Sequence, residues 1–438
     1  MTCGFPGSPR PFSPPVPQTI EELGLPESLV TDLVLRRLLL DGYSTLSKLS
    51  ERLKLSLPIV DQIFRQLRQQ QLLEVKGMVG NDYTFSLTQT GRQLATERFQ
   101  ISHYAGPAPV SLRDYHVATR AQAARVKVDR KALRLAFSDL VLPDHLLDQL
   151  GPALISQTSL FLYGPSGNGK TSIAERLLRI YKDAILIPYA VEVDNQIICV
   201  YDPVVHKALE TSDPDIDPRW VLCHRPCILV GGELVPSMIE LRLDESSGIY
   251  AAPLQMKANN GIFVIDDFGR QLMSPRELLN RWIVPLDRRV DHLTLRYGVK
   301  FAIPFEVMVV FSTNLDPLQL ADEAFLRRIP NKIFIGEIDA AIFDEIFQRI
   351  LTSRKLPASP DAVPYLRELC LRYSGHLRAC YPGDICSIIQ SIAVYEGCPP
   401  EVTRSTLERA AELYFARPSH VPLADECRPA EASRPLPY

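Results

Sequence analysis

The chain has 438 residues, of which 46% are hydrophobic and 23% are charged, and its formal net charge is -3. This composition is typical of globular proteins, and the length allows two or three domains. The slight acidity disfavours a uniformly basic nucleic-acid-binding protein, and no apolar run reaches the roughly 18 residues of a membrane span. Because the N-terminus also lacks the pattern of a secretory signal, we expect a cytoplasmic protein without a membrane partner.

Both ends of the chain are rich in proline. Residues 1–24 and 418–438 each carry several prolines. Segments of this composition bury too little apolar surface to fold. We therefore predict a disordered leader over 1–24 and a disordered tail over 418–438.

Residues 25–100 predict helices followed by a β-hairpin. Apolar residues recur at helical spacing in three stretches, the second capped by Ser44 and the third opened by Ser56. Two strand patterns then flank a turn at 80–82. This order of elements, and the string at 83–92 in particular, resemble the winged-helix domain.

Two kinds of partner suit such a domain. Its candidate DNA-binding side chains are accompanied by acids, with Arg65, Arg68 and Lys76 set against Asp61, Glu74 and Asp82. No dense basic face results. We therefore favour a module that binds a protein substrate or adaptor, and we keep DNA binding through residues 25–130 as the alternative. Residues 101–130 are predicted to be a locally basic linker.

The strongest motif lies at residues 160–171. An apolar run predicts a buried strand, and a helical pattern begins directly after Thr171. Between them stands the string G-x-x-x-x-G-K-[ST], made by Gly164, Pro165, Ser166, Gly167, Asn168, Gly169, Lys170 and Thr171. The N–H groups of such a loop surround phosphate oxygens. We expect Lys170 to reach the β- and γ-phosphates of ATP and the Thr171 hydroxyl to bind Mg²⁺.

A second buried strand is predicted directly before two acids. Residues 262–265 are apolar, and Asp266 and Asp267 follow them. Ligands bind at the carboxyl edge of open parallel sheets. We therefore expect Asp266 to hold Mg²⁺ and Asp267 to polarise the attacking water.

Two later positions complete the candidate site. Residues 306–311, which are apolar after Glu306, predict a buried strand. Asn314 emerges after it at the same edge, where an amide can bond both the γ-phosphate and the water. A turn-forming role for Asn314 is the alternative. Arg327 and Arg328 are either surface charges or fingers that reach the γ-phosphate of a neighbouring subunit.

Taken together, these motifs resemble the AAA+ ATPases. Residues 164–171, 262–267, 312–314 and 327–328 match, in order, Walker A, Walker B, sensor 1 and the arginine finger. The resemblance implies an α/β fold over 131–336, with a parallel five-stranded sheet sandwiched by helices, and a C-terminal helical lid over 337–417. It also implies a ring of copies, usually hexameric, with ATP bound between subunits.

The chain departs from that pattern at two places. Asp267 stands where a glutamate is usual, so its reach to water is shorter. Lids of this family often carry an arginine at the start of the third helix, where this chain has Gly383. The resemblance then implies a backbone contact from Gly383 to the nucleotide, with Arg378 as a weaker candidate for the missing arginine.

The interval between the glycine loop and the two acids is long for the family. Residues 202–220 are acidic and predict an inserted surface segment. Ile249 and Tyr250 are candidates for a pore loop, with packing in the core as the alternative. Cys223 and Cys227 are either half of a zinc site or separate thiols. We favour thiols because no second ligand pair lies at metal-site spacing.

The leading hypothesis is a AAA+ ATPase that hydrolyses Mg·ATP in a ring and remodels a protein target selected by its winged-helix domain. The first alternative is a DNA-associated ATPase of replication, transposition or transcription. The second is a nucleotide-gated scaffold with little turnover, which the Asp266-Asp267 pair allows.

Overall fold

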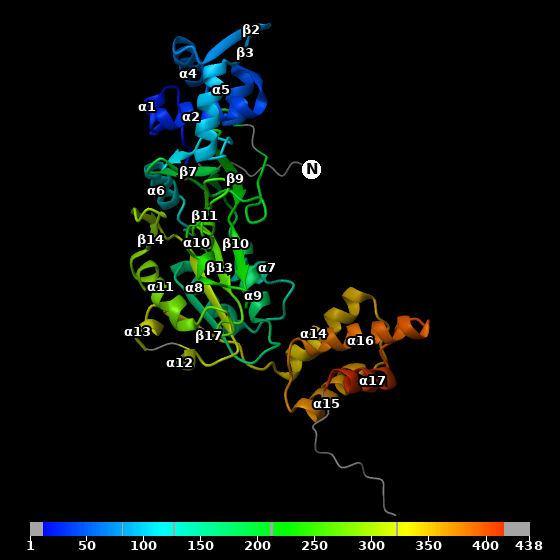
Figure 1. Cartoon of the computed structure of the whole chain (residues 1–438). Helices are drawn as coiled ribbons and strands as arrows, with labels where there is room; N and C mark the ends of the chain where they lie inside the picture. The colour runs from blue at the N-terminus through cyan, green and yellow to red at the C-terminus, as the bar shows by residue number, and fades with distance from the viewer. Residues whose placement is uncertain (1–11, 81, 126–127, 211–212, 321–322, 416–438) are drawn as a thin grey trace, which may run out of the picture. The chain divides into compact units, whose positions relative to one another are not determined.

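The computed structural model describes residues 12–80, 82–125, 128–210, 213–320 and 323–415. The chain divides into two compact units, residues 1–336 and 337–438 (Figure 1). The predicted tail over 418–438 lies outside the described residues. No helix in the described part of the chain is long and apolar enough to cross a membrane.

A parallel sheet forms the centre of the first unit. Its strands are β5 (Leu160–Tyr163), β10 (Cys227–Val230), β13 (Ile262–Ile265), β16 (Met308–Thr313) and β17 (Asn331–Phe334). Their order is β10-β13-β16-β5-β17, and all neighbours are parallel. The strands are nearly continuous apolar runs, as expected of a sheet that is buried on both faces.

Helices cover both faces of this sheet. One face packs against α7 (Arg130–Ala136), α8 (Asp144–Ser156) and α9 (Lys170–Arg176). The other packs against α11 (Pro275–Arg288) and α13 (Glu323–Leu326). The predicted α/β fold, with a parallel five-stranded sheet between helices, is confirmed.

Further strands occupy the interval between α9 and β13. They are β6 (Ala184–Pro188), β7 (Ala190–Val193), β8 (Gln196–Cys199), β9 (Trp220–His224), β11 (Arg242–Asp244) and β12 (Ile249–Ala251). With β4 (Val110–Ser111), four of them form a mixed sheet of order β11-β12-β8-β7-β4, while β6 pairs with β9. This interval has its own hydrophobic core.

Two predictions for this interval are corrected. Residues 202–220 are not only surface, because Ile216 and Trp220 lie in that core. Tyr250 is 2% exposed in β12, and its hydroxyl accepts the Arg296 N–H at 3.0 Å. Tyr250 is therefore a core residue, and the pore-loop hypothesis for it is wrong. Its neighbour Ile249 is partly buried in the same strand.

A hairpin stands between α11 and β16. Its strands are β14 (Val290–Thr294) and β15 (Lys300–Pro304), which pair antiparallel. The helix α10 (Leu254–Lys257) leads into β13, and α12 (Pro317–Leu320) follows β16.

Helices and a small antiparallel sheet form the N-terminal part of the first unit. The helices are α1 (Ile20–Leu23), α2 (Glu27–Asp41), α3 (Leu46–Leu53), α4 (Leu57–Gln69) and α5 (Gln89–Ile101). The sheet has the order β1-β3-β2, with bounds Tyr43–Thr45, Asp82–Leu87 and Leu73–Val79. The predicted hairpin is confirmed, but the predicted cap at Ser44 is wrong. Ser44 is buried in β1, and the Thr45 hydroxyl accepts the Lys48 N–H at 3.2 Å.

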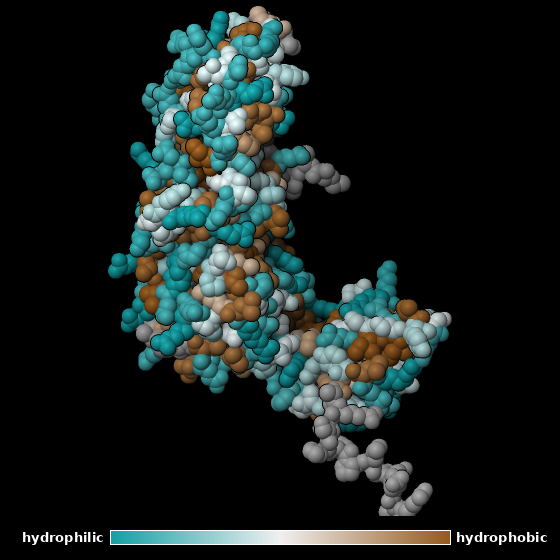
Figure 2. All heavy atoms as spheres, in the orientation of Figure 1, coloured by the Kyte–Doolittle hydropathy of each residue, from teal (hydrophilic) through white to brown (hydrophobic). Residues whose placement is uncertain are grey.

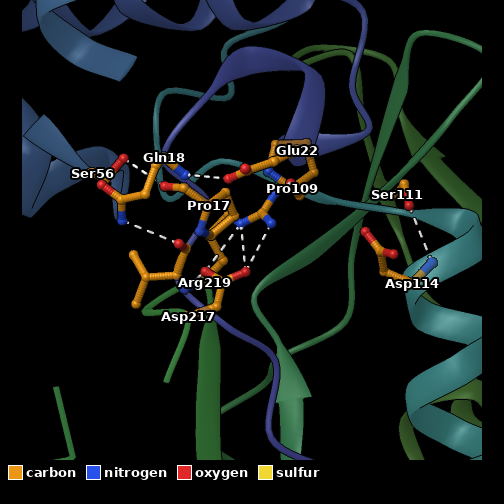
Figure 3. Close-up of polar contacts among 10 residues, drawn as sticks. Pro17, Gln18, Glu22, Ser56, Pro109, Ser111, Asp114, Asp217 and Arg219 are labelled. Carbon is orange, nitrogen blue, oxygen red and sulfur yellow. Dashed lines mark hydrogen bonds and ion pairs between the residues drawn. The ribbon is translucent and has the colours of Figure 1, made fainter. Parts of the chain in front are cut away.

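The predicted disordered leader is wrong for its described part, residues 12–24. The Pro14 carbonyl accepts the Asp217 N–H at 3.0 Å. The Pro17 carbonyl accepts the Ser56 hydroxyl at 2.6 Å (Figure 3). Proline lacks an N–H but keeps its carbonyl, so donors on neighbouring folded segments can order a proline-rich stretch.

The predicted linker over 101–130 is also wrong in part, because its chain is built into the fold. β4 pairs in parallel with β7, and α6 (Leu112–Ala121) packs into the core of the interval. Residues 126 and 127 lie outside the described part of the chain. Short parallel pairings of this kind leave no local signal in the sequence.

Asp217 and Arg219 form a buried ion pair beside the proline-rich segment (Figure 3). Their side chains are 2% and 3% exposed. The guanidinium donates from Nε and Nη2 to Asp217 Oδ2, at 3.0 and 2.8 Å, and from Nη1 to the Pro109 carbonyl at 3.0 Å. The pair therefore joins the interval to the chain that precedes β4.

Replacing Asp217 with alanine is expected to destabilise the first unit, because the buried Arg219 guanidinium would lose its counter-charge. Removing one partner of a buried pair costs about 3–5 kcal/mol. We expect this loss in the unfolding transition that tryptophan fluorescence reports, since Trp220 and Trp282 both lie in the first unit. The exposed Asp215→Ala is the matched control, expected to shift stability by less than about 0.5 kcal/mol. A loss below about 1 kcal/mol in Asp217→Ala would contradict the role of the pair.

The second unit is helical in its described residues. Its helices are α14 (Ala340–Arg354), α15 (Ala362–Ser374), α16 (Tyr381–Glu396) and α17 (Arg404–Tyr414), which confirms the helices predicted there. They enclose a core that includes Phe343, Phe347 and Leu407. Figure 2 shows hydrophobic side chains gathered on one face of this unit, and its exposed hydrophobic residues include Val394 and Leu413.

Candidate nucleotide-binding site

The loop between β5 and α9 turns on three glycines. Gly164, Gly167 and Gly169 have φ angles of 137°, 82° and 87°, which residues with a side chain rarely adopt. A Cβ atom at Gly164 would also lie 2.2 Å from the Ile335 carbonyl oxygen. The glycines therefore allow a turn in which backbone N–H groups can point at phosphate oxygens.

Lys170 begins α9 and is 6% exposed. Its Nζ donates to the carbonyl oxygens of Gly164 and Pro165, at 2.8 and 2.9 Å, and to Asn314 Oδ1 at 2.6 Å. The Lys170 ammonium group is therefore a buried positive charge that hydrogen bonds hold in place beside the glycine loop. Of the other loop residues, Ser166 is exposed and Asn168 is buried.

Thr171 and Asp266 form a pair of oxygen ligands. The Thr171 hydroxyl donates to Asp266 Oδ2 at 2.7 Å. Mg²⁺ takes oxygen ligands, usually one or two from the protein and the rest from phosphates and water. This donor set fits Mg²⁺ bound together with a nucleotide. Among the described residues, no group of three or more His, Cys, Asp and Glu side chains could hold a metal by itself.

Asn314 joins Lys170 to Asp267. Its Oδ1 accepts the Lys170 ammonium, and its Nδ2 donates to Asp267 Oδ1 at 3.3 Å. Asp267 is exposed, with a φ of 47°, in the left-handed region that aspartate tolerates better than most residues. The Asp267 carboxylate can therefore accept a proton from a water molecule beside the Asn314 amide.

The sheet brings these residues together. β16 lies between β13 and β5, with Ile265 paired to Phe311 and Thr313 paired to Tyr163. The strands end close to one level, so the side chains that follow them meet at one edge. Lys170 and Asn314 are 144 positions apart in the chain, yet their side chains are hydrogen-bonded.

Further residues, which the sequence does not predict, support the site. The Thr313 hydroxyl donates to a backbone carbonyl of the loop after β13, and the Gln271 amide bonds that same loop. Asp139 accepts hydrogen bonds from Arg179 and Arg176 beside α9, at 2.6 and 2.8 Å. Burial alone would raise the pKa of the Asp139 carboxyl, but these bonds outweigh it and hold the pKa below its usual value. No local motif marks such residues.

The two candidate finger arginines differ in their surroundings. Arg328 Nε donates to Asp287 Oδ2 at 2.6 Å, which ties Arg328 to α11. Arg327 is exposed and has no ion pair with any residue that the structure describes. Of these two arginines, Arg327 is therefore the better candidate for a finger.

Gly383 and Arg378 belong to the second unit. Gly383 lies in the first turn of α16. The Arg378 guanidinium lies over the Tyr381 ring, 5.8 Å from its centroid. Their contacts with a nucleotide stay predictions.

The two neighbouring cysteines do not resemble a metal site. Cys223 is buried in β9, and Cys227 begins β10. Burial raises the pKa of the Cys223 thiol to about 12 and that of Cys227 to about 11. Among the residues that the structure describes, these two thiols belong to no group of three or more His, Cys, Asp and Glu side chains that could hold a metal ion. The interpretation as separate thiols is supported.

Comparisons with known proteins add little to this picture. Residues 339–413 match a family described as a domain of unknown function, DUF8689. A sequence search of curated proteins finds no match.

Similar solved structures include RuvB from Thermotoga maritima and NtrX from Brucella abortus. One point mutant of RuvB is 11% identical over 62% of this chain and 69% of its own, with a TM-score of 0.37. The RuvB Holliday junction branch migration motor is 10% identical over 67% and 72%, with a TM-score of 0.35. NtrX is 14% identical over 83% of this chain and 66% of its own, with a TM-score of 0.39.

Proposed function

We propose that the protein is a AAA+-type ATPase that binds Mg·ATP at the edge of its parallel sheet and hydrolyses it. The observation that carries the proposal is the connected group at that edge. Lys170 is hydrogen-bonded to Asn314 and Asn314 to Asp267, while Thr171 is bonded to Asp266. The group combines a fixed cation, an amide, an exposed carboxylate and oxygen ligands for a metal, which are the parts that phosphoryl transfer to water requires.

Each side chain has a role in the reaction. Lys170 neutralises charge on the β- and γ-phosphates, and the Asn314 amide holds the attacking water. Asp267 accepts a proton from that water while the water oxygen bonds to the γ-phosphorus. The bond from the γ-phosphorus to the β,γ-bridging oxygen breaks, and this oxygen leaves with ADP. Thr171 and Asp266 would hold Mg²⁺, which when bound supplies positive charge to the phosphate oxygens.

Release of inorganic phosphate from ATP by the full chain tests this proposal. We expect release that depends on Mg²⁺ and is lost when Asp267 is replaced. Tight ATP binding without release would contradict hydrolysis and would favour the nucleotide-gated scaffold instead. The resemblance to AAA+ ATPases also implies a ring of copies, usually hexameric. A mass measurement with and without ATP, made on the same sample, tests whether the chain forms such a ring.

Replacing Arg327 with alanine is expected to lower turnover by about 10³-fold with little change in ATP affinity, since an arginine finger acts mainly in the transition state. Arg328→Ala is the matched control. Because Arg328 is paired with Asp287, its loss should reduce stability more than turnover. Phosphate release and ATP binding, measured for both variants, check this expectation.

Mixing variants tests whether Arg327 acts between subunits. Arg327→Ala keeps its own glycine loop, and Lys170→Ala keeps its Arg327. In a mixed ring some interfaces would join an intact loop to an intact arginine, so turnover should recover above that of either variant alone. No recovery in a demonstrably mixed assembly would contradict action in trans.

The N-terminal part of the first unit is proposed to select a protein target. Its exposed hydrophobic residues include Tyr43, Met78 and Tyr83. Two of the three candidate phosphate-binding side chains are already paired, since Arg65 lies 2.6 Å from Asp61 and Lys76 lies 2.6 Å from Glu74. A surface with apolar side chains and internally paired charges supports a protein partner over DNA.

The DNA alternative can be tested by charge reversal. We expect the wild-type chain to bind duplex DNA no more tightly than a Kd of about 10⁻⁶ M at physiological salt, the upper end of non-specific affinity. The triple variant Arg65→Glu, Arg68→Glu, Lys76→Glu should leave phosphate release unchanged. Tighter binding that weakens steeply with salt, and that the triple variant loses, would favour a DNA-associated ATPase.

A further inference from the structure

The loop that follows β13 holds an unusual backbone. Asp267 has a φ of 47° and Gly269 a φ of 106°. Between them Phe268 is 1% exposed, and its N–H donates to the Ser312 carbonyl at 2.7 Å. The buried phenyl ring fixes the middle of the loop, but it leaves the peptide groups around Asp267 to find partners elsewhere.

The Gln271 side chain supplies three of these bonds, and the Arg270 N–H also donates to the Asp267 carbonyl at 3.0 Å. Gln271 Nε2 donates to the carbonyl oxygens of Asp266 and Asp267, at 2.8 and 3.1 Å. Its Oε1 accepts the Gly269 N–H at 2.8 Å. One amide thus bonds the backbone on both sides of Phe268, and both of the carbonyls it binds belong to the acids of the site.

We propose that Gln271 is a positioning residue that holds Asp267 in its left-handed conformation. This inference rests on the proposed function, because it assigns Asp267 the proton-accepting role. A left-handed aspartate is strained relative to the common backbone regions. Among the residues that the structure describes, the Asp267 carboxylate is held by one long hydrogen bond, at 3.3 Å from Asn314 Nδ2. The backbone bonds from Gln271 therefore help to set where the Asp267 carboxylate lies, together with the Arg270 N–H on the Asp267 carbonyl and the Asp267 N–H on Asp266 Oδ1, each at 3.0 Å.

The chemistry of the contact requires an amide. Glutamate at position 271 could accept the Gly269 N–H, but it could not donate to the carbonyls of Asp266 and Asp267. It would also add negative charge beside two carboxylates. Methionine has a similar length and makes none of these strong bonds. These two replacements separate the bonds of Gln271 from its volume.

Hydrogen–deuterium exchange tests the contact without reference to activity. In the nucleotide-free chain, Gln271→Met should speed exchange in peptides that contain the Gly269 amide, while exchange in β13 itself stays unchanged. Arg270→Met is the matched control, since Arg270 is the exposed neighbour, and it should leave exchange as in the wild type. Unchanged exchange in Gln271→Met would overturn the inference.

Turnover and ATP affinity give the second test. Gln271→Met and Gln271→Glu should each lower kcat by about 10- to 100-fold, as expected when a catalytic group is displaced by roughly 1 Å, and should change ATP affinity by less than about 3-fold. The double variant Asp267→Asn, Gln271→Met should turn over no more slowly than Asp267→Asn alone, because Gln271 acts through Asp267.

The outcomes separate this inference from the function beneath it. Wild-type turnover that depends on Asp267 but survives in Gln271→Met or Gln271→Glu would overturn the inference alone. A further large loss in the double variant would also overturn it, since Gln271 would then act elsewhere. A wild-type chain without turnover that depends on Asp267 would overturn the proposed function, and the inference with it.

Discussion

Replacing Lys170 with alanine is expected to abolish ATP binding and turnover. The ammonium group is buried and held by the oxygens of Gly164, Pro165 and Asn314, so it is already placed at the mouth of the glycine loop. A charge-assisted contact to phosphate contributes about 3 kcal/mol, which corresponds to a loss in affinity of about 100-fold or more. Calorimetric titration with ATP in Mg²⁺ measures this loss.

The control for this variant is Lys182→Ala, because Lys182 is an exposed lysine on the same unit. It should bind ATP as the wild type does. Thermal unfolding of both variants separates a loss of binding from a loss of structure. Tight ATP binding by a folded Lys170→Ala protein would contradict the assignment of the glycine loop.

Replacing Asp267 with asparagine is expected to leave ATP binding intact and to stop turnover. Asparagine also tolerates the left-handed backbone found here, and it can still bond Asn314. It cannot take a proton from water, and the loss of a general base lowers kcat by about 10²- to 10⁴-fold. Phosphate release under saturating ATP measures the effect.

The reference variant for Asp267→Asn is Asp316→Asn, which changes an exposed aspartate after the neighbouring strand. It should retain wild-type turnover. Unimpaired phosphate release by Asp267→Asn would contradict the role of Asp267 as the base. Lys170, Thr171 and Asp266 would then form a nucleotide-binding site in which another group accepts the proton.

The main parts of the site could be predicted because their signals are local. The glycines of 164–169 are needed where φ is positive, and no other residue fits Gly164 beside the Ile335 carbonyl. The acids Asp266 and Asp267 follow an apolar strand in the sequence itself. Local patterns of this kind can be recognised without knowing how the rest of the chain folds.

The corrected predictions share a physical cause. The proline-rich residues 12–24 and the supposed linker look unfolded by composition, yet distant partners such as Ser56, Asp217 and strand β7 order them. The aromatic side chain of Tyr250 would suit either a pore loop or a hydrophobic core. Its burial becomes apparent only in the folded structure. Contacts between residues far apart in the sequence determine whether these segments are ordered or buried. Such contacts produce no periodic pattern in the sequence.

Gln271 illustrates the same limit within the site. An amide five residues after the first acid resembles any polar loop residue, and its bonds to the backbone become visible only once Phe268 is buried and Gly269 has turned. Asn314 is an intermediate case between the glycine loop and Gln271. The strand before it could be predicted from the sequence, but its two hydrogen bonds could not.

A crystal structure of the Asp267→Asn protein bound to Mg·ATP tests the central claim most directly. We predict electron density for the triphosphate along the glycine loop, with its γ-phosphate contacted by Lys170 and Asn314 and the metal bound by Thr171 and Asp266. A nucleotide bound elsewhere on the chain, or a metal held without Asp266, would contradict the proposal that these side chains form one ATP-hydrolysing site.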